Sequence, residues 1–222
     1  MSSVKDKKEL CRNWNLYVIT DIGMAAPRSY HQIFHEILLG GANVVQLRDK
    51  TTPFETLVDV GRKIKPLCEE FGATLIVNDN PYLAKEINAD GVHLGQEDMP
   101  VDIAREIVGD EKLIGLSTHT KTQALMSMLM DVDYIGVGPI FPTLTKTQIY
   151  KPLGLSMLGW ASKEIRIPFV PIGGINTDNI CDVWRIGKRA PAVVSAIMKA
   201  SDLTAATKSL INLITQTKQE LQ

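Results

Sequence analysis

The chain has 222 residues, of which 45% are apolar and 22% charged, and its formal net charge at pH 7 is −1. This composition can fill one large core, and the near-neutral charge excludes general attraction to nucleic acid or to an anionic membrane. The amino terminus is polar, which argues against a signal peptide, and no apolar run is long enough to span a bilayer. The three cysteines are far apart in the sequence, which argues against a disulfide framework. We therefore expect a cytoplasmic protein with reduced thiols.

Short apolar runs alternate with longer amphipathic segments along the chain. The runs that predict strands lie at residues 16–20, 43–47, 74–78, 91–94, 113–116, 134–137, 169–172 and 192–195. The segments that predict helices lie at residues 30–39, 54–71, 102–108, 121–130, 178–186 and 202–217. Most strand runs are apolar at successive positions, which is typical of parallel strands covered on both faces.

This alternation predicts an α/β protein with a single (β/α)8 TIM barrel at residues 15–222, preceded by a polar N-terminal arm at residues 1–14. A doubly wound open sheet is the competing arrangement. The least regular stretch, residues 139–154, is long and polar, and loops of this kind are often lids or binding loops.

Polar residues follow the carboxyl ends of the predicted strands, which in a barrel open onto the face where catalytic groups gather. Arg48 and Lys50 stand two apart after the second strand, so both can project to one side and hold phosphate oxygens. The alternative is a solvated pair bonded to Asp49 or to a neighbouring helix.

Asp79 and Asp98 follow the third and fourth predicted strands and are candidate ligands for Mg²⁺, which prefers oxygen and often binds one or two carboxylates plus phosphate. Either aspartate could instead cap a turn or the next helix. The pair Gly173-Gly174 follows the seventh strand, where bare backbone can approach a phosphate, although a tight turn at positive φ would also select glycine.

The four histidines do not predict a metal site or a nucleophilic triad. His31 and His35 are four residues apart, but Gln32 stands where a zinc-protease motif needs glutamate. His93 and His119 lie near strand ends without an evident Ser–His–Asp set, so we expect supporting hydrogen bonds from both.

Taken together, the segments from about residue 16 to residue 197 resemble the thiamine phosphate synthase family. The matching stretches are VVQLRDK at 44–50, VND at 77–79, GVHLGQEDMP at 91–100, IGLSTHT at 114–120, DYIGVGPIFPTLTK at 133–146, PIGGI at 171–175 and VVSAI at 193–197. The double glycine alone is shared by many barrels, whereas the ordered set is specific. The family usually has Glu where Asp49 stands, and GKRAP at 187–191 replaces a smaller approach to the last strand.

The resemblance implies an Mg²⁺-dependent transferase that condenses hydroxymethylpyrimidine pyrophosphate with a thiazole phosphate and releases pyrophosphate. It implies that the pyrimidine pyrophosphate is contacted by Gln46, Arg48, Lys50, Asn78, Ser117 and Lys146. It matches Asp79 and Asp98 to the magnesium ligands, and it places the thiazole phosphate at Thr143, Thr145, Gly174, Val194 and Ser195. Arg48, Lys50, Lys146 and Ser117 would then be catalytic.

The implied chemistry needs charge stabilisation and orientation more than a base, because the thiazole nitrogen is already nucleophilic. We expect a dissociative displacement in which pyrophosphate leaves early and Lys146 helps to exclude water. Two alternatives remain open: a thiazole tautomerase, which would not need the metal pair or Lys146, and a non-catalytic regulatory barrel. The expected partners are small phosphorylated substrates, and the oligomeric state stays undetermined.

Overall fold

The computed structural model describes residues 4–143 and 150–221 and contains eight parallel strands. The strands are β1 (Tyr17–Ile19), β2 (Val44–Leu47), β3 (Thr74–Asn78), β4 (Gly91–Leu94), β5 (Leu113–Thr118), β6 (Tyr134–Val137), β7 (Phe169–Pro171) and β8 (Ala192–Val193). The helices are α1 (Val4–Arg12), α2 (Tyr30–Leu39), α3 (Phe54–Glu70), α4 (Pro81–Glu86), α5 (Val101–Val108), α6 (Lys121–Ser127), α7 (Gly154–Glu164), α8 (Ile180–Gly187), α9 (Ser195–Met198) and α10 (Leu203–Glu220).

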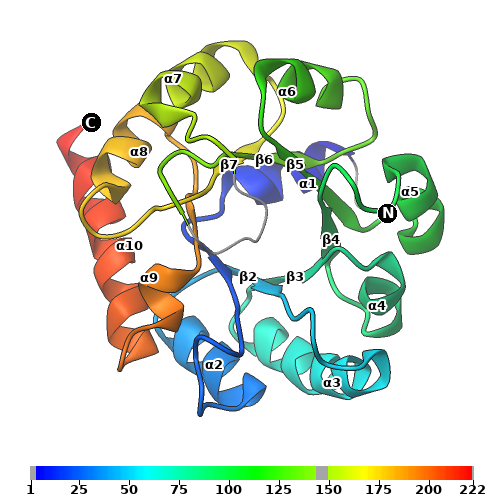
Figure 1. Cartoon of the computed structure of the whole chain (residues 1–222). Coiled ribbons are helices and arrows are strands. Elements are labelled where there is room, and N and C mark those ends of the chain that lie inside the picture. The colour runs from blue at the N-terminus through cyan, green and yellow to red at the C-terminus, as the bar shows by residue number, and fades with distance from the viewer. Residues whose placement is uncertain (1–3, 144–149, 222) are drawn as a thin grey trace.

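The strands form a closed ring surrounded by helices (Figure 1). From β1 to β7 each strand pairs with its sequence neighbours, and β1 also pairs with β8. A parallel bridge between Ile172 and Ala192 then joins the end of β7 to β8. A doubly wound sheet would reverse its strand order at one point, and this sheet does not. The prediction of a single (β/α)8 barrel is confirmed.

Apolar side chains fill two layers, one on each side of the strands. On β1, Tyr17 and Ile19 belong to a cluster inside the ring, whereas Val18 packs with the helices outside it. All three are buried, with at most 7% of the surface of any one exposed. Both sides of β1 are therefore covered, which explains why its sequence is apolar at successive positions rather than alternating.

The predicted N-terminal arm contains helix α1, which packs against the amino ends of β5 and β6. Lys7 is buried there, and its Nζ donates to the Asp110 carbonyl at 2.8 Å and pairs with the Asp133 carboxylate at 3.0 Å. Trp14, just beyond the helix, lies in the inner cluster with only 2% of its surface exposed. The segment thus seals the end of the barrel opposite the carboxyl ends of the strands.

Three other helices were not among the predicted segments. Helix α4 is short, and its first turn is fixed by Asn80, whose side chain accepts the Leu83 N–H at 3.0 Å. Helix α7 starts at Gly154, within the stretch predicted to be a loop. Helix α9 has only four residues, too few to show a helical period. None of the helices in the described parts of the chain is both long enough and apolar enough to cross a bilayer.

Candidate active site

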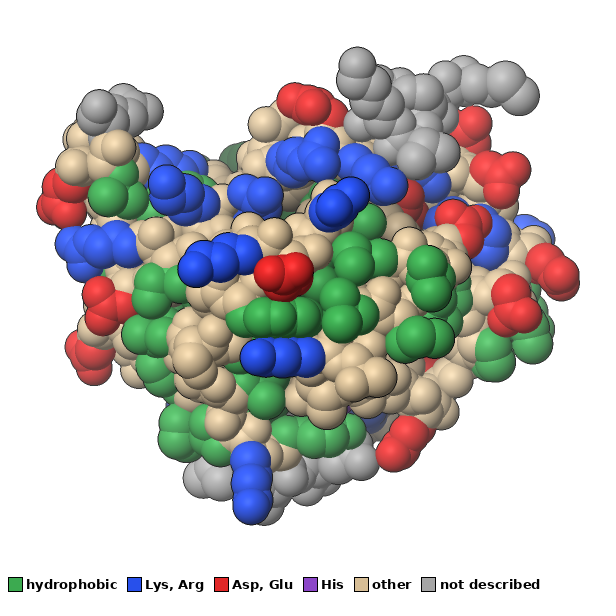
Figure 2. Space-filling model, turned by 90° about the horizontal axis from the view of Figure 1, so that it is seen from above, with side chains coloured by type: hydrophobic (Ala, Val, Ile, Leu, Met, Phe, Trp, Pro, Cys, Tyr) green, Lys and Arg blue, Asp and Glu red, His purple; other side chains and the backbone are tan. Residues whose placement is uncertain are grey.

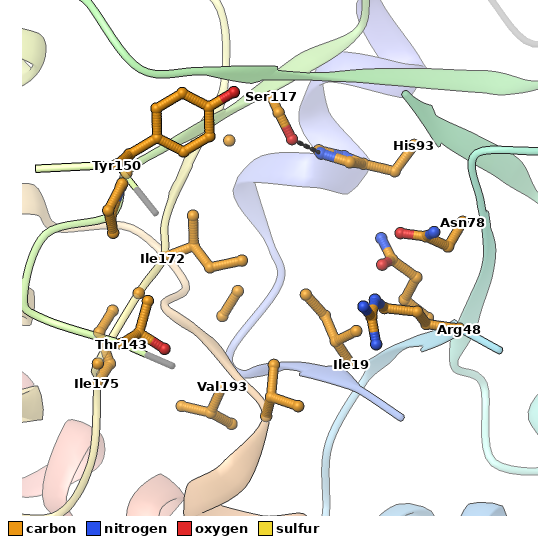
Figure 3. Close-up of a pocket in the computed structure, with 18 of the residues that line it drawn as sticks. Ile19, Arg48, Asn78, His93, Ser117, Thr143, Tyr150, Ile172, Ile175 and Val193 are labelled. Carbon is orange, nitrogen blue, oxygen red and sulfur yellow. Dashed lines mark hydrogen bonds between the residues drawn. The ribbon is translucent and has the colours of Figure 1, made fainter. Parts of the chain in front are cut away.

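A pocket opens at the carboxyl ends of the strands (Figure 3). Its lining includes these residues from the predicted site: Gln46, Arg48, Asn78, Asp79, Ser117, Thr143, Gly174, Val194 and Ser195. Lys50 and Asp98 adjoin the pocket through contacts with Asp79. Thr145 and Lys146 lie outside the described residues. The strand ends thus bring residues from distant parts of the chain to one cavity, as the barrel prediction required.

The two basic residues after β2 are each held by a carboxylate. The Arg48 Nη1 atom lies 3.1 Å from Asp21 Oδ2, and the Arg48 backbone N–H donates to Thr20 Oγ1 at 3.2 Å. Lys50 Nζ lies 3.1 Å from Asp79 Oδ2, although 64% of the lysine side chain remains exposed. Arg48 is therefore oriented before any ligand arrives, whereas Lys50 keeps freedom to exchange its partner.

Asp49 fixes the loop that carries these two cations. Its carboxylate accepts hydrogen bonds from the Tyr30 hydroxyl and from the backbone N–H groups of Thr51 and Thr52. Partial burial acts to raise the pKa of Asp49, but these hydrogen bonds outweigh it and hold the pKa well below its usual value. Asp49, at a position where the resembled family usually has Glu, is therefore a structural anchor for the loop.

The carboxyl groups of Asp79 and Asp98 lie against each other at the edge of the pocket. Burial is the main effect that raises the pKa of Asp79, and the hydrogen-bonded Asp98 carboxyl raises it further. Nearby Lys50 acts in the opposite direction but does not outweigh them. Asp98 is positioned by the Gly95 N–H, which donates to its Oδ2 at 2.6 Å. A Cβ atom at Gly95 would come within 2.9 Å of that oxygen, so glycine gives the carboxylate room to approach.

This acidic pair fits a magnesium ion that is shared with a phosphorylated ligand. Among the described residues, no cluster of three or more His, Cys, Asp or Glu side chains could hold a metal alone. Mg²⁺ commonly binds only one or two carboxylates and takes its other ligands from water and substrate phosphates. Two adjoining carboxylates repel each other, and a divalent cation between them would remove that repulsion.

The opposite side of the pocket is mainly apolar. Figure 3 shows Ile172, Ile175 and Val193 across the cavity from Arg48 and Asn78. The ring of Tyr150 stacks on His119 with centroids 3.8 Å apart and an angle of 14° between the planes. This half of the pocket therefore suits a flat, apolar ring, while the half beside Arg48 suits an anion.

The double glycine meets a steric requirement of the turn after β7. Gly173 and Gly174 have φ values of 101° and 64°, in the left-handed region that favours glycine. A Cβ atom would come within 2.5 Å of Pro139 Cα from Gly173, and within 2.5 Å of the Pro142 carbonyl oxygen from Gly174. The turn explanation therefore holds, and Gly173 and Gly174 also line the pocket.

Several pocket and core residues were missed by sequence reasoning. Tyr150 lines the pocket directly, and Tyr17 and Tyr134 lie beneath it inside the barrel. The two buried tyrosines had one available signal, a hydroxyl group within an otherwise apolar strand. His93 had been expected to support other groups, and its Nε2 lies 2.9 Å from Ser117 Oγ.

Comparisons with known proteins agree with one another. The family model described as thiamine monophosphate synthase matches residues 16–197. The chain is 40% identical to the thiamine-phosphate synthase of Dictyoglomus thermophilum, with 94% of each chain covered. It is 42% identical to that of Chloroflexus aurantiacus, covering 94% of this chain and 96% of the relative. The structure of thiamine phosphate pyrophosphorylase from Pyrococcus furiosus superimposes with a TM-score of 0.86 at 35% identity, covering 94% of this chain and 98% of that one. By sequence and by structure, the chain belongs to the thiamine monophosphate synthase family.

Proposed function

We propose that this chain is an Mg²⁺-dependent thiamine phosphate synthase, which joins hydroxymethylpyrimidine pyrophosphate to thiazole phosphate and releases pyrophosphate. The observation that carries the proposal is the acidic pair, Asp79 and Asp98, placed beside Arg48 and Lys50 at one edge of a pocket with an apolar far side. Such a pocket can hold a metal-bound diphosphate at one end and an aromatic ring at the other.

The charged half would bind the pyrimidine pyrophosphate. Arg48 offers a planar fork of donors and Lys50 a compact charge, and both can contact phosphate oxygens. Gln46, Asn78 and Ser117 also line the pocket and can donate hydrogen bonds to the substrate. Mg²⁺ held by Asp79 and Asp98 would neutralise charge on the diphosphate. Lys146, outside the described residues, is assigned to the same substrate by the family resemblance.

The apolar half would bind the thiazole phosphate. Ile172 and the stacked rings of His119 and Tyr150 provide a surface for the thiazole ring. The phosphate is assigned to Thr143, Gly174, Val194 and Ser195, which lie in the pocket, and to Thr145, outside the described residues. Two substrates bound in opposite halves would face each other across the pocket, and such alignment lowers the entropic part of the barrier.

The reaction then requires no side chain to remove a proton. The bond between the pyrimidine methylene carbon and oxygen breaks, and its electron pair leaves with pyrophosphate. The lone pair of the thiazole nitrogen forms the new carbon–nitrogen bond. Arg48, Lys50, Ser117 and Lys146 would stabilise the departing charge, which in a site that excludes water is a large part of catalysis. A dissociative order, with the carbocation formed first, is the order we propose.

The alternatives predict a different use of these residues. A tautomerase would not need paired carboxylates beside cations, and a regulatory barrel would bind ligands without turnover. The partners that fit the pocket are small phosphorylated molecules, and we propose that the protein acts in the cytoplasm.

Pyrophosphate release measured with each substrate alone and with both together tests the activity. Release that needs both substrates and Mg²⁺ supports the proposal, whereas isomerisation of the thiazole without metal would support the tautomerase. Ligand binding with no turnover would support the regulator.

The metal site is tested by Asp98→Asn, with Asp59→Asn on the exposed surface of α3 as the matched control. Loss of a direct ligand should raise the Mg²⁺ concentration needed for half-maximal release at least about tenfold, since even outer-shell changes cost about 10–100-fold in metal affinity. A second measurement needs no turnover. Mg²⁺ with pyrophosphate should raise the melting temperature of the wild-type and Asp59→Asn proteins more than that of Asp98→Asn. Equal responses in all three proteins would contradict the assignment.

A further inference from the structure

An unbroken series of hydrogen bonds crosses the inside of the barrel beneath the pocket. Gln46 Nε2 donates to the Tyr17 hydroxyl at 2.7 Å, and the Tyr17 and Tyr134 hydroxyl oxygens are 3.0 Å apart. The Tyr134 hydroxyl lies 3.1 Å from His93 Nδ1, and His93 Nε2 lies 2.9 Å from Ser117 Oγ. Both ends of this series, Gln46 and Ser117, line the pocket.

The direction of these hydrogen bonds is fixed by the Gln46 amide. The Gln46 N–H donates to the Tyr17 oxygen, and Gln46 therefore cannot accept the Tyr17 hydroxyl hydrogen through the same contact. Within the described residues the only acceptor left for that hydrogen is the Tyr134 oxygen. Tyr134 then accepts from Tyr17, and in the described part of the chain the only acceptor for its own hydrogen is His93 Nδ1. A buried hydroxyl that left its hydrogen unbonded would cost about 1–3 kcal/mol, so the reverse direction is disfavoured at both tyrosines.

We propose that this directed series sets the His93 tautomer and makes Ser117 a hydrogen-bond donor to the ligand in the pocket. Because His93 Nδ1 accepts from Tyr134, the neutral ring carries its proton on Nε2 and donates it to Ser117 Oγ. The serine oxygen is thereby occupied as an acceptor. Its own hydrogen has no other acceptor among the described residues and is free to point into the pocket.

The surroundings keep this series intact. Trp14 packs edge-on against Tyr17 and Tyr134, with ring centroids 5.6 and 4.9 Å away, and closes the barrel below them. Burial raises the pKa of both tyrosines, so the two hydroxyls keep their protons. Gly115 makes room for the contact between Tyr134 and His93, because a Cβ atom there would lie 2.2 Å from Tyr134 Cζ and 2.5 Å from His93 Nδ1.

The consequence for the reaction rests on the proposed function. A departing pyrophosphate gains negative charge and needs donors directed at its oxygens. If the Ser117 hydroxyl could donate to His93, it would be turned away from the pyrophosphate part of the time. Because Ser117 instead accepts from His93, its own hydrogen stays available for a pyrophosphate oxygen. Tyr17 and Tyr134 touch no substrate and are therefore positioning residues. The same series links Gln46, assigned to the pyrimidine pyrophosphate, to the Ser117 donor.

The tautomer can be measured directly by long-range proton–nitrogen NMR on the ¹⁵N-labelled full-length protein. The chain has four histidines, so the His93 signals are assigned by their loss in His93→Gln. We expect His93 to show a protonated Nε2 and an unprotonated Nδ1 at neutral pH. A proton on Nδ1, or averaging between the two nitrogens, would overturn the proposed direction. This measurement requires neither substrate nor turnover.

The catalytic consequence is tested by a double-mutant cycle of Tyr134→Phe and Ser117→Ala. With Ser117 present, Tyr134→Phe should lower kcat about tenfold, the order expected for one hydrogen bond to a charged group, and leave the KM for thiazole phosphate unchanged. In the Ser117→Ala background the same change should alter kcat less than about twofold, because coupled residues are not additive. Equal losses in both backgrounds would show a merely structural role and refute the proposal.

Melting temperatures of all four proteins separate loss of folding from loss of positioning. If Tyr134→Phe does not fold, Tyr17→Phe replaces it in the cycle, with the same criterion. If the wild-type protein releases no pyrophosphate, the role assigned to Ser117 falls together with the proposed function. The NMR result still decides the direction of the hydrogen bonds in that case, so the two failures are distinguishable.

Discussion

Gly115 lies on β5 directly beneath the contact between Tyr134 and His93, and Gly115→Ala should destabilise the barrel. The new Cβ atom would meet Tyr134 Cζ at 2.2 Å and His93 Nδ1 at 2.5 Å. The Tyr134 ring cannot move away freely, because it is completely buried and packs against Trp14. Overpacking of this kind costs about 1–3 kcal/mol, and the short distances favour the upper end of that range.

A smaller opposing effect reduces the net change. Replacing a strand glycine by alanine restricts the unfolded chain and stabilises the protein by about 0.4–1 kcal/mol. The net loss should therefore be about 2 kcal/mol, which for a domain of this size lowers the melting temperature by about 4–8 °C. Urea denaturation monitored by tryptophan fluorescence, together with a thermal scan, gives both quantities.

Gly136→Ala is the matched control, since Gly136 occupies the neighbouring strand β6. A Cβ atom there meets its nearest neighbour, His93 Cε1, at 3.4 Å, an ordinary contact. We expect this variant to be as stable as the wild type or slightly more so. The cost of Gly115→Ala should also shrink in a Tyr134→Leu background, which removes the obstructing ring. Equal stability of the Gly115→Ala and Gly136→Ala proteins would refute the steric reasoning.

Three further predictions concern polar groups that anchor the two ends of the barrel: Lys7 at the amino ends of the strands, and Asp49 and Asp21 beside the pocket. Lys7→Met should lower the free energy of unfolding by about 2–3 kcal/mol, because it leaves the Asp110 carbonyl without its donor and removes one partner of buried Asp133. Urea denaturation measures this loss beside the control Lys8→Met, whose side chain on the same helix is more exposed than that of Lys7. Asp49→Asn should be destabilising at pH 7. Because the pKa of Asp49 is depressed in the folded protein, the ionised side chain stabilises the fold fully at pH values above its unfolded pKa of about 4, and this stabilisation is lost as the pH falls from there toward the folded pKa. The melting temperatures of variant and wild type should therefore converge in acid, and a difference that stays constant with pH would contradict this. Asp21→Asn should raise the KM for the pyrimidine pyrophosphate several-fold with little change in kcat, because Arg48 loses the carboxylate that orients it; an unchanged KM would show that Arg48 needs no such support.

The Figure 2 view presents basic and apolar side chains interspersed on one outer face of the molecule. The most exposed large apolar residue of the described chain, Leu129, follows α6, and Leu125 and Met126 on that helix are also exposed. Scattered apolar residues are normal on protein surfaces.

The sequence by itself determined the barrel and the face on which the site lies. The β3, β4 and β6 bounds were predicted to the residue, because strands covered on both sides are apolar throughout and end where polar residues begin. The same rule placed Gln46, Arg48 and Asp79 at strand ends, and in a parallel barrel all such ends share one face.

Only the tertiary structure decided which of these groups touch. Asp79 and Asp98 meet because Asp79, directly after β3, has a left-handed φ of 64° and because Gly95 lets the Asp98 carboxylate approach. Hydrophobic periodicity reveals neither feature. Tyr17 and Tyr134 are 117 residues apart and meet because closure brings β1 and β6 across one interior. A sequence specifies which side of a strand a residue occupies, but contacts across a barrel depend on strand register and closure, which arise only when all eight strands are assembled.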